Sequence, residues 1–242
     1  MGTGDHRLWS AIEGYIDEAL LGEDPILEAA ARRGEEAGLP PIAVSPNQGK
    51  MLQLLARLVH ATQILELGTL AGYSTIWLAR ALPTGGRMTT IEANPDYAEV
   101  ATGNIAAAGL EGVVDLRVGD AHEVLPRLIE AAAGPFDLIF IDADKKSTPE
   151  YFRWALELAR EGSLVIVDNV VRRGDVLGGG AAGGELGAGE QATVDGIRAF
   201  YELMADERRA HGEERLSATA IPTVGSKGLD GFALVLVSGT PA

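Results

Sequence analysis

The stretch QILELGTLAGYS, Gln63 to Ser74, decides the fold. A short apolar run ends at Leu67, and a turn flanked by Gly68 and Gly72 leads into a helical pattern that begins near Tyr73. The same succession of apolar run and helix recurs down the chain, with strands expected at 63–67, 86–93, 113–120, 136–144 and 163–170. Such alternation predicts an α/β fold with a doubly wound parallel sheet. Runs such as LIFI and LVIV, apolar on both faces, are typical of central strands that helices cover on both sides.

The two ends of the chain depart from this alternation. Residues 7–40 predict two helices, and Ser45 and Pro46 predict the start of a third. Near the C-terminus, after a helix expected at 194–209, LSATAIPT and GFALVLVSG predict two strands joined by the turn VGSKGLDG. With no helix between them, this pair should be antiparallel. We therefore expect a single domain, 1–242, with a helical N-terminal extension, 1–45.

Two local features carry further expectations. Ser147 and Glu150 have the spacing of a capping box at the start of a helix. Residues 178–190 are rich in Gly and Ala and lack periodicity, which predicts a flexible surface loop or, alternatively, a lid beside a site.

Composition excludes several classes of function. The net charge of −15 argues against nucleic acid as a partner, because a polyanion would be repelled. The absence of cysteine excludes disulfides and thiolate metal sites. No apolar run is long enough for a membrane span, and residues 1–30 show no basic start followed by an apolar core. These features predict a cytoplasmic protein without a membrane partner.

The first motif that carries chemistry is the glycine turn with the acidic strand ends around it. Gly68 would let the backbone approach a ligand, and the helix that follows offers free N–H groups to an anion. Glu92, at the end of the second strand, could accept hydrogen bonds from both ribose hydroxyls, while Glu66 suits a cationic amino group. A ligand with ribose, ammonium and carboxylate fits S-adenosylmethionine. The alternatives are a purely structural turn and a dinucleotide site, although G-x-G-x-x-G is absent.

The second motif is a pair of strands that each end in a carboxylate. Asp142 follows FDLIFI, while Asp168 and Asn169 follow LVIV. If these strands are neighbours, the two ionised carboxylates repel each other, and a divalent cation would remove the repulsion. Oxygen ligands indicate Mg²⁺, Mn²⁺ or Ca²⁺ rather than zinc. Lys145 beside such a cation should lose its proton more easily and could act as a general base. The structural alternative is that each Asp caps a helix or forms a turn.

Four motifs in order resemble one known family. SPNQGKMLQLL (45–55), LELGTLAGYST (65–75), FIDADKK (140–146) and VDNVVRRGDV (167–176) resemble the cation-dependent S-adenosylmethionine O-methyltransferases, which include caffeoyl-CoA and catechol O-methyltransferases. The resemblance covers residues 40–240. It implies a Rossmann-like class I methyltransferase fold, with a seven-stranded, mostly parallel sheet whose last strand is antiparallel and helices on both faces. It also implies a homodimer.

The resemblance also implies roles for individual residues. Metal ligands would be Asp142, Asp168 and Asn169, and Lys145, with Asp142 beside it, would carry the catalysis. The cofactor would contact Val44, Glu66, Gly68, Thr69, Ser74, Glu92, Asp120, Ala121, Asp142 and Asp144. The substrate would contact Lys145, Asn169 and Arg173. Thr148 stands where plant members have a tyrosine, and the turn VGSKGLDG is longer than the usual GDG.

The function that these expectations favour is methyl transfer from S-adenosylmethionine to a hydroxyl of a catechol-like phenolic small molecule, with Mg²⁺, Mn²⁺ or Ca²⁺ holding the vicinal oxygens. The alternatives are a nicotinamide-dependent oxidoreductase on a similar fold and a non-catalytic homologue that only binds S-adenosylmethionine. The departures from the plant pattern argue against a coenzyme-A thioester as the acceptor.

Overall fold

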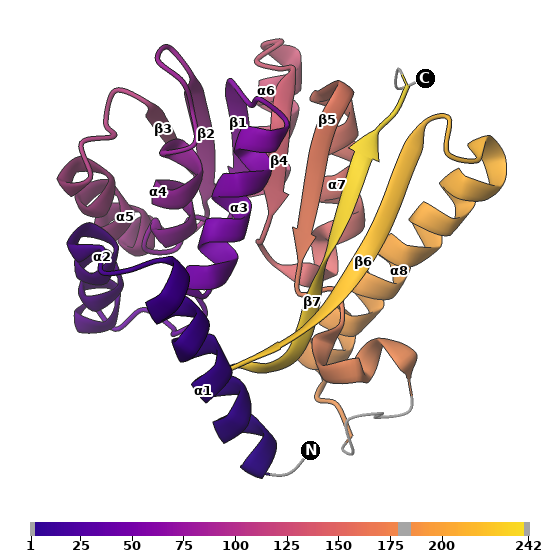
Figure 1. Cartoon of the computed structure of the whole chain (residues 1–242). Helices are drawn as coiled ribbons and strands as arrows, with labels where there is room; N and C mark the ends of the chain where they lie inside the picture. The colour runs from indigo at the N-terminus through magenta and orange to yellow at the C-terminus, as the bar shows by residue number, and fades with distance from the viewer. Residues whose placement is uncertain (1–2, 179–184, 240–242) are drawn as a thin grey trace.

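A computed structural model describes residues 3–178 and 185–239 of the 242-residue chain. Its centre is a seven-stranded sheet in the order β3-β2-β1-β4-β5-β7-β6 (Figure 1). The strands are β1 (Gln63–Leu67), β2 (Arg87–Glu92), β3 (Val114–Val118), β4 (Phe136–Ile141), β5 (Ala159–Asp168), β6 (Leu216–Gly225) and β7 (Gly228–Val237). Neighbours from β3 to β5 pair in parallel, whereas β7 is antiparallel to both β5 and β6. The predicted fold class, with an antiparallel last strand, is confirmed.

Helices cover both faces of this sheet. They are α1 (Thr3–Leu20), α2 (Pro25–Glu36), α3 (Pro46–Leu58), α4 (Tyr73–Ala79), α5 (Pro95–Ala107), α6 (Ala121–Glu130), α7 (Thr148–Glu157) and α8 (Ala188–His211), with 3₁₀ turns η1 (Lys145–Ser147) and η2 (Arg172–Leu177). Along β1, alternate residues face opposite layers: Leu65 packs with α6, α7 and α8, and Ile64 packs with α2, α3 and α4. All six residues of β4 are buried, as expected for a central parallel strand.

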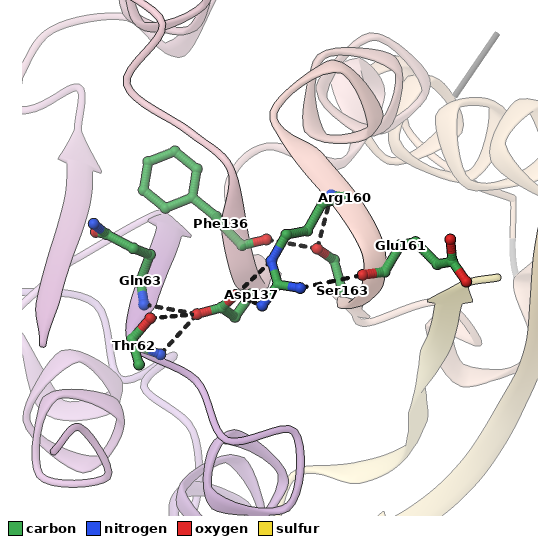
Figure 2. A network of polar contacts seen from close by, with 7 residues as sticks. All are labelled: Thr62, Gln63, Phe136, Asp137, Arg160, Glu161 and Ser163. Atoms are coloured by element: carbon green, nitrogen blue, oxygen red, sulfur yellow. Dashed lines mark hydrogen bonds and ion pairs between the residues drawn. The ribbon is translucent and has the colours of Figure 1, made fainter. Parts of the chain in front are cut away.

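A buried carboxylate ties three strands together at the amino ends of the parallel strands. Asp137, in β4, accepts hydrogen bonds from both the backbone N–H and the hydroxyl of Thr62, from the N–H of Gln63, and from the guanidinium of Arg160 (Figure 2). Beside it, the Ser163 hydroxyl bridges the Phe136 carbonyl and the Arg160 N–H. The pairing of β4 with β5 shifts register at this point, and the network connects the two strands there. Strand β5 begins at Ala159, earlier than the sequence predicts.

The first two helices contact different parts of the fold: α1 contacts β6 and α3, and α2 packs against α4 and α5. Asp24 caps α2, Ser45 caps α3, and each helix opens with a proline, as predicted. Helix α1 runs beside the tip of the β6–β7 hairpin (Figure 1), where Glu13 accepts the N–H of Ser226 at 2.9 Å. In the described part of the chain, no helix has the length and apolar character that a membrane crossing requires.

Three local expectations differ from the structure. Ser147 makes no side-chain cap on α7, because its hydroxyl donates to Asp144 at 2.9 Å instead. The turn between β6 and β7 is much tighter than predicted, since pairing continues to Gly225 and Gly228. Helix α8 begins at Ala188, so the end of the predicted loop 178–190 is helical, while residues 179–184 of that loop lie outside the described residues.

Candidate active site

A pocket of about 440 Å³ lies at the carboxyl ends of the parallel strands. This is where open α/β sheets bind their ligands. The structure brings most of the predicted site residues together on its lining: Val44, Gly68, Thr69, Ser74, Glu92, Asp120, Ala121, Asp142, Asp144, Lys145 and Asn169. These residues come from parts of the chain that are far apart in sequence, so the pocket exists only once the sheet is assembled.

The glycine turn after β1 is required by the packing of the sheet. Gly68 has a φ of +94°, and a side chain there would overlap the Asp142 backbone carbonyl, 2.5 Å from the position of a Cβ atom. Gly72 adopts the left-handed conformation as the N-cap of α4. The turn therefore brings the N-terminus of α4 to the pocket and lets β4 end directly beside β1.

Glu92 holds this turn from the neighbouring strand. One of its carboxylate oxygens accepts the backbone N–H groups of Thr69 (3.2 Å) and Leu70 (2.8 Å), and the other accepts the N–H of Asn94 (2.9 Å). Leu70 has a φ of +50°, an uncommon conformation that these hydrogen bonds stabilise. Glu92 also lines the pocket, so one carboxylate both shapes the turn and faces a ligand.

Glu66 lies behind the pocket wall and does not line it. Its side chain is completely buried and accepts hydrogen bonds from Ser74 (2.7 Å), Thr75 (2.5 Å) and Thr90 (2.7 Å). Burial raises the pKa of Glu66 to about 7, although the three hydroxyl groups act in the opposite direction. The contact with the pocket is made by Ser74, which Glu66 orients.

Lys145 is the predicted general base. It begins the 3₁₀ turn η1, shortly after β4 ends at Ile141. Its side chain is buried, and its Nζ atom lies 2.5 Å from Asp142 Oδ1. Helix α8 packs directly on the Lys145 backbone carbonyl at Gly196, where any side chain would overlap it. The lysine is thus fixed from behind by a helix and from the side by the carboxylate.

Asp168, at the end of neighbouring β5, is a buried carboxylate with a perturbed pKa. Its Oδ2 atom accepts the side-chain amide of Gln48 and its Oδ1 atom the N–H of Asn169, each at 2.8 Å. Burial raises the pKa of Asp168 to about 7, and the negative charge of Asp142 adds to the shift. Asn169 follows with a φ of +58° and lines the pocket.

The donors at these two strand ends fit a hard divalent cation. The set consists of carboxylate and amide oxygens from Asp142, Asp168 and Asn169, the ligand types that Mg²⁺, Mn²⁺ and Ca²⁺ prefer. A cation would also offset the repulsion by Asp142, which adds to the effect of burial in raising the pKa of Asp168. Within residues 3–178 and 185–239, no three His, Cys, Asp or Glu side chains gather into a metal-binding group. The predicted set differs from such a group in having two carboxylates and one amide.

Three of the predicted site residues are absent from the pocket lining. Asp168, like Glu66, is not on the pocket lining. Arg173 is also absent from the lining, and its exposed side chain lies 3.5 Å from Glu190 and 3.8 Å from Asp175. Its neighbour Arg172 lines the pocket instead. Both arginines have positive φ values in the loop after β5, and it is Arg172, not the Arg173 that the family resemblance implies, that reaches the pocket.

Several lining residues were not among the predicted site residues. Tyr151 donates its hydroxyl to Asp144 at 2.5 Å, and burial raises the pKa of Tyr151, as does the Asp144 carboxylate. Tyr97 and Ile42 also line the pocket. The tyrosines lie within helices whose apolar spacing is equally consistent with core packing, so only the assembled structure shows that they reach the site.

Fold, pocket and paired strand ends together define a Rossmann-like methyltransferase. A model of the O-methyltransferase family matches residues 18–209. A catechol O-methyltransferase of Niastella koreensis is 47% identical, covering 96% of this chain and 99% of the relative. A second catechol O-methyltransferase, from Mycobacterium tuberculosis, is 45% identical, and the match covers 93% of this chain and 94% of the relative. The chain belongs to the O-methyltransferase family, which confirms the predicted enzyme class over the nicotinamide alternative.

Solved structures agree with this assignment. An O-methyltransferase from Bacillus cereus, solved in complex with SAH, has a TM-score of 0.87 at 46% identity and covers 96% of this chain and 99% of its own. The O-methyltransferase TomG from Streptomyces achromogenes, involved in tomaymycin synthesis and solved in complex with SAM, has a TM-score of 0.86 at 45% identity. It covers 99% of this chain and 100% of its own.

Proposed function

We propose that this O-methyltransferase takes its methyl group from S-adenosylmethionine, requires a divalent cation, and methylates one hydroxyl of a catechol-like small molecule. The observation that carries the proposal is the arrangement at the ends of β4 and β5. There, Asp142 and Lys145 form a 2.5 Å pair beside the buried Asp168, at one end of the same pocket that Glu92 and the glycine turn line.

The proposed donor fits the half of the pocket around the glycine turn. Glu92 offers carboxylate oxygens to ribose hydroxyls, and Asp120 and Ala121 line the pocket at the N-terminus of α6. Ser74, oriented by the buried Glu66, offers a hydroxyl oxygen to the amino group. When bound, S-adenosylmethionine supplies an electrophilic methyl group, and its transfer leaves a neutral thioether. The solved complexes of similar enzymes with SAM and SAH support this choice of donor.

Asp142, Asp168 and Asn169 would hold the cation. When bound, a divalent cation supplies a positive charge that lowers the pKa of hydroxyl groups it binds. Two carboxylates balance the two charges of the ion, and Asn169 adds a neutral oxygen. Such a site favours an acceptor with two adjacent oxygens, and the names of the two catechol O-methyltransferase relatives agree with that chemistry.

Lys145 is the residue that would take the hydroxyl proton. The step requires the neutral amine, whose nitrogen accepts the proton as the acceptor oxygen bonds to the methyl carbon and the carbon–sulfur bond breaks. Asp142 accepts a hydrogen bond from the Nζ atom of Lys145 and so holds the end of the side chain. Helix α8 packs on the Lys145 backbone and keeps it in place. Much of the acceleration should come from this fixed geometry, because positioning alone can supply roughly 7–11 kcal/mol.

The proposal is tested by methyl transfer from isotopically labelled S-adenosylmethionine in the presence of Mg²⁺. Acceptors should be compared in matched pairs, catechol against resorcinol and 3,4-dihydroxybenzoate against 3,5-dihydroxybenzoate, with products identified by mass. We expect one methyl group on the vicinal diol and little or none on its isomer. Equal transfer to both isomers would contradict a site that holds adjacent oxygens.

A further inference from the structure

Gln48 contacts the buried Asp168 from a distant part of the chain. It lies in the first turn of α3, where the Ser45 hydroxyl accepts its backbone N–H, and its side-chain Nε2 atom donates to Asp168 Oδ2 at 2.8 Å. We propose that Gln48 is a positioning residue for the divalent cation, which holds the Asp168 carboxylate in the orientation that lets Asp168 and Asp142 bind one ion. This inference rests on the proposed cation-dependent function.

The hydrogen bonds to Asp168 fix its orientation without neutralising its charge. Each carboxylate oxygen accepts one uncharged donor, the Gln48 amide on Oδ2 and the Asn169 N–H on Oδ1. Among the ion pairs formed by the described residues, none includes Asp168. Neither of the two donors carries a positive charge, so these hydrogen bonds leave the carboxylate able to bind a cation. Partners that orient metal ligands in this way typically contribute about 10- to 100-fold to metal affinity.

Helix α3 holds Gln48 firmly in this position. The next residue, Gly49, packs so closely on Trp77 of α4 that any side chain would overlap the indole ring. The loop just before α3 contributes Val44 to the pocket lining. The packing of Gly49 on Trp77 thus fixes the backbone of the first turn of α3, which keeps the Gln48 side chain within reach of Asp168.

An amide suits this position better than a carboxylate. Glutamate at position 48 would bring a third negative charge within hydrogen-bond distance of Asp168, where burial and Asp142 already disfavour ionisation. The amide satisfies the carboxylate oxygen and leaves the site with two negative charges, which match a divalent cation. The residue type at position 48 is therefore part of what sets the charge of the site.

The test is calorimetric titration of the folded protein with MnCl₂, and separately with MgCl₂, in the absence of acceptor. Gln48→Met keeps the size of the side chain and removes the donor, and we expect it to bind Mn²⁺ about 10- to 100-fold more weakly than wild type. Gln53→Met is the matched control, because Gln53 is a buried amide in the same helix that accepts a hydrogen bond from Lys50 and lies outside the pocket. It should bind Mn²⁺ like wild type, and Gln48→Met should still bind S-adenosylhomocysteine normally.

Equal Mn²⁺ affinity of wild type and Gln48→Met would overturn the role of Gln48 and leave the proposed function standing. Equal weakening in both variants would also overturn it, because a looser α3 would explain the loss. A wild-type protein that binds neither cation would contradict the cation-dependent function itself.

Discussion

Two aspartates near opposite ends of neighbouring strands are equally buried and behave differently. Asp137, at the start of β4, is 4% exposed, and Asp168, at the end of β5, is 5% exposed. Burial would raise the pKa of Asp137, but the donors of Thr62, Gln63 and Arg160 hold it below its usual value (Figure 2). Burial raises the pKa of Asp168 to about 7, and Asp142 adds to the shift.

We interpret this difference as one between a carboxylate that stabilises the fold and a carboxylate that we propose binds a cation. Asp137 accepts hydrogen bonds from an arginine and from several N–H and O–H donors, so groups of the protein itself balance its negative charge. Asp168 has two uncharged donors, and the negative charge of Asp142 and the positive charge of Lys145 act on it in opposite directions. Perturbed groups of the second kind concentrate at functional sites, because their charge is available to something that binds.

The largest effect should come from the lysine beside the perturbed carboxylates. Lys145→Ala removes the proposed base and should lower kcat by about 10²- to 10⁴-fold, with S-adenosylhomocysteine binding unchanged. Lys146→Ala removes the same charge from an exposed neighbour and should leave kcat near wild type. Steady-state rates at saturating donor and catechol provide the measurement. Similar losses in both variants would mean that charge, and not proton transfer by Lys145, matters.

Replacing Asp137 by asparagine should mainly affect stability, whereas the same replacement of Asp168 should mainly affect activity. Asp137→Asn leaves donors without an ionised partner and should lower the free energy of unfolding by about 1–3 kcal/mol, with activity per folded molecule kept. Asp168→Asn should lower methyl transfer but leave the free energy of unfolding unchanged or higher, because it removes a buried charge that Asp142 repels. Urea unfolding at pH 8 in EDTA measures the free energy of unfolding of the two variants. Equal destabilisation by the two substitutions would contradict the distinction.

Glu66 is an intermediate case, because it has three hydroxyl donors and still has a pKa raised to about 7 by burial. The unfolded chain releases this proton near pH 4.5, and the folded protein holds it to about pH 7. Ionised Glu66 therefore costs stability increasingly as pH rises through this window. Glu66→Gln should become more stable relative to wild type from pH 4.5 to pH 7, by no more than about 3 kcal/mol. A difference that stays constant with pH would mean that Glu66 titrates normally.

The smallest effect concerns the loop after β5, where Arg172 lines the pocket in place of the predicted Arg173. Arg172→Ala should raise the KM for the acceptor about two- to tenfold, the contribution of one hydrogen bond, because Arg172 lines the pocket. Arg173→Ala removes an exposed side chain that faces Glu190 and should leave KM unchanged. Steady-state kinetics with one catechol compare the two. The reverse order would restore the residue that family resemblance indicates.

The sequence was informative where local pattern determines structure. Buried parallel strands such as β4 are almost continuously apolar, so their order along the chain and their acidic ends could be read directly. Contacts between distant segments could not: Gln48 and Asp168 meet only because α3 packs beside the end of β5. Ser147 failed as a cap because Asp144, three residues earlier, accepts its hydroxyl. The homodimer and the cytoplasmic location stay predictions.

The most direct test of the central claim is methyl transfer to catechol by wild-type protein after treatment with EDTA, before and after excess Mg²⁺ is restored. If Asp142, Asp168 and Asn169 hold a cation that activates the acceptor, transfer should stop in EDTA and return with Mg²⁺, while S-adenosylhomocysteine binding persists throughout. Transfer that continues at the same rate in EDTA would contradict the claim. The charge of Asp168 would then serve the fold or proton transfer, and the difference from Asp137 would need another cause.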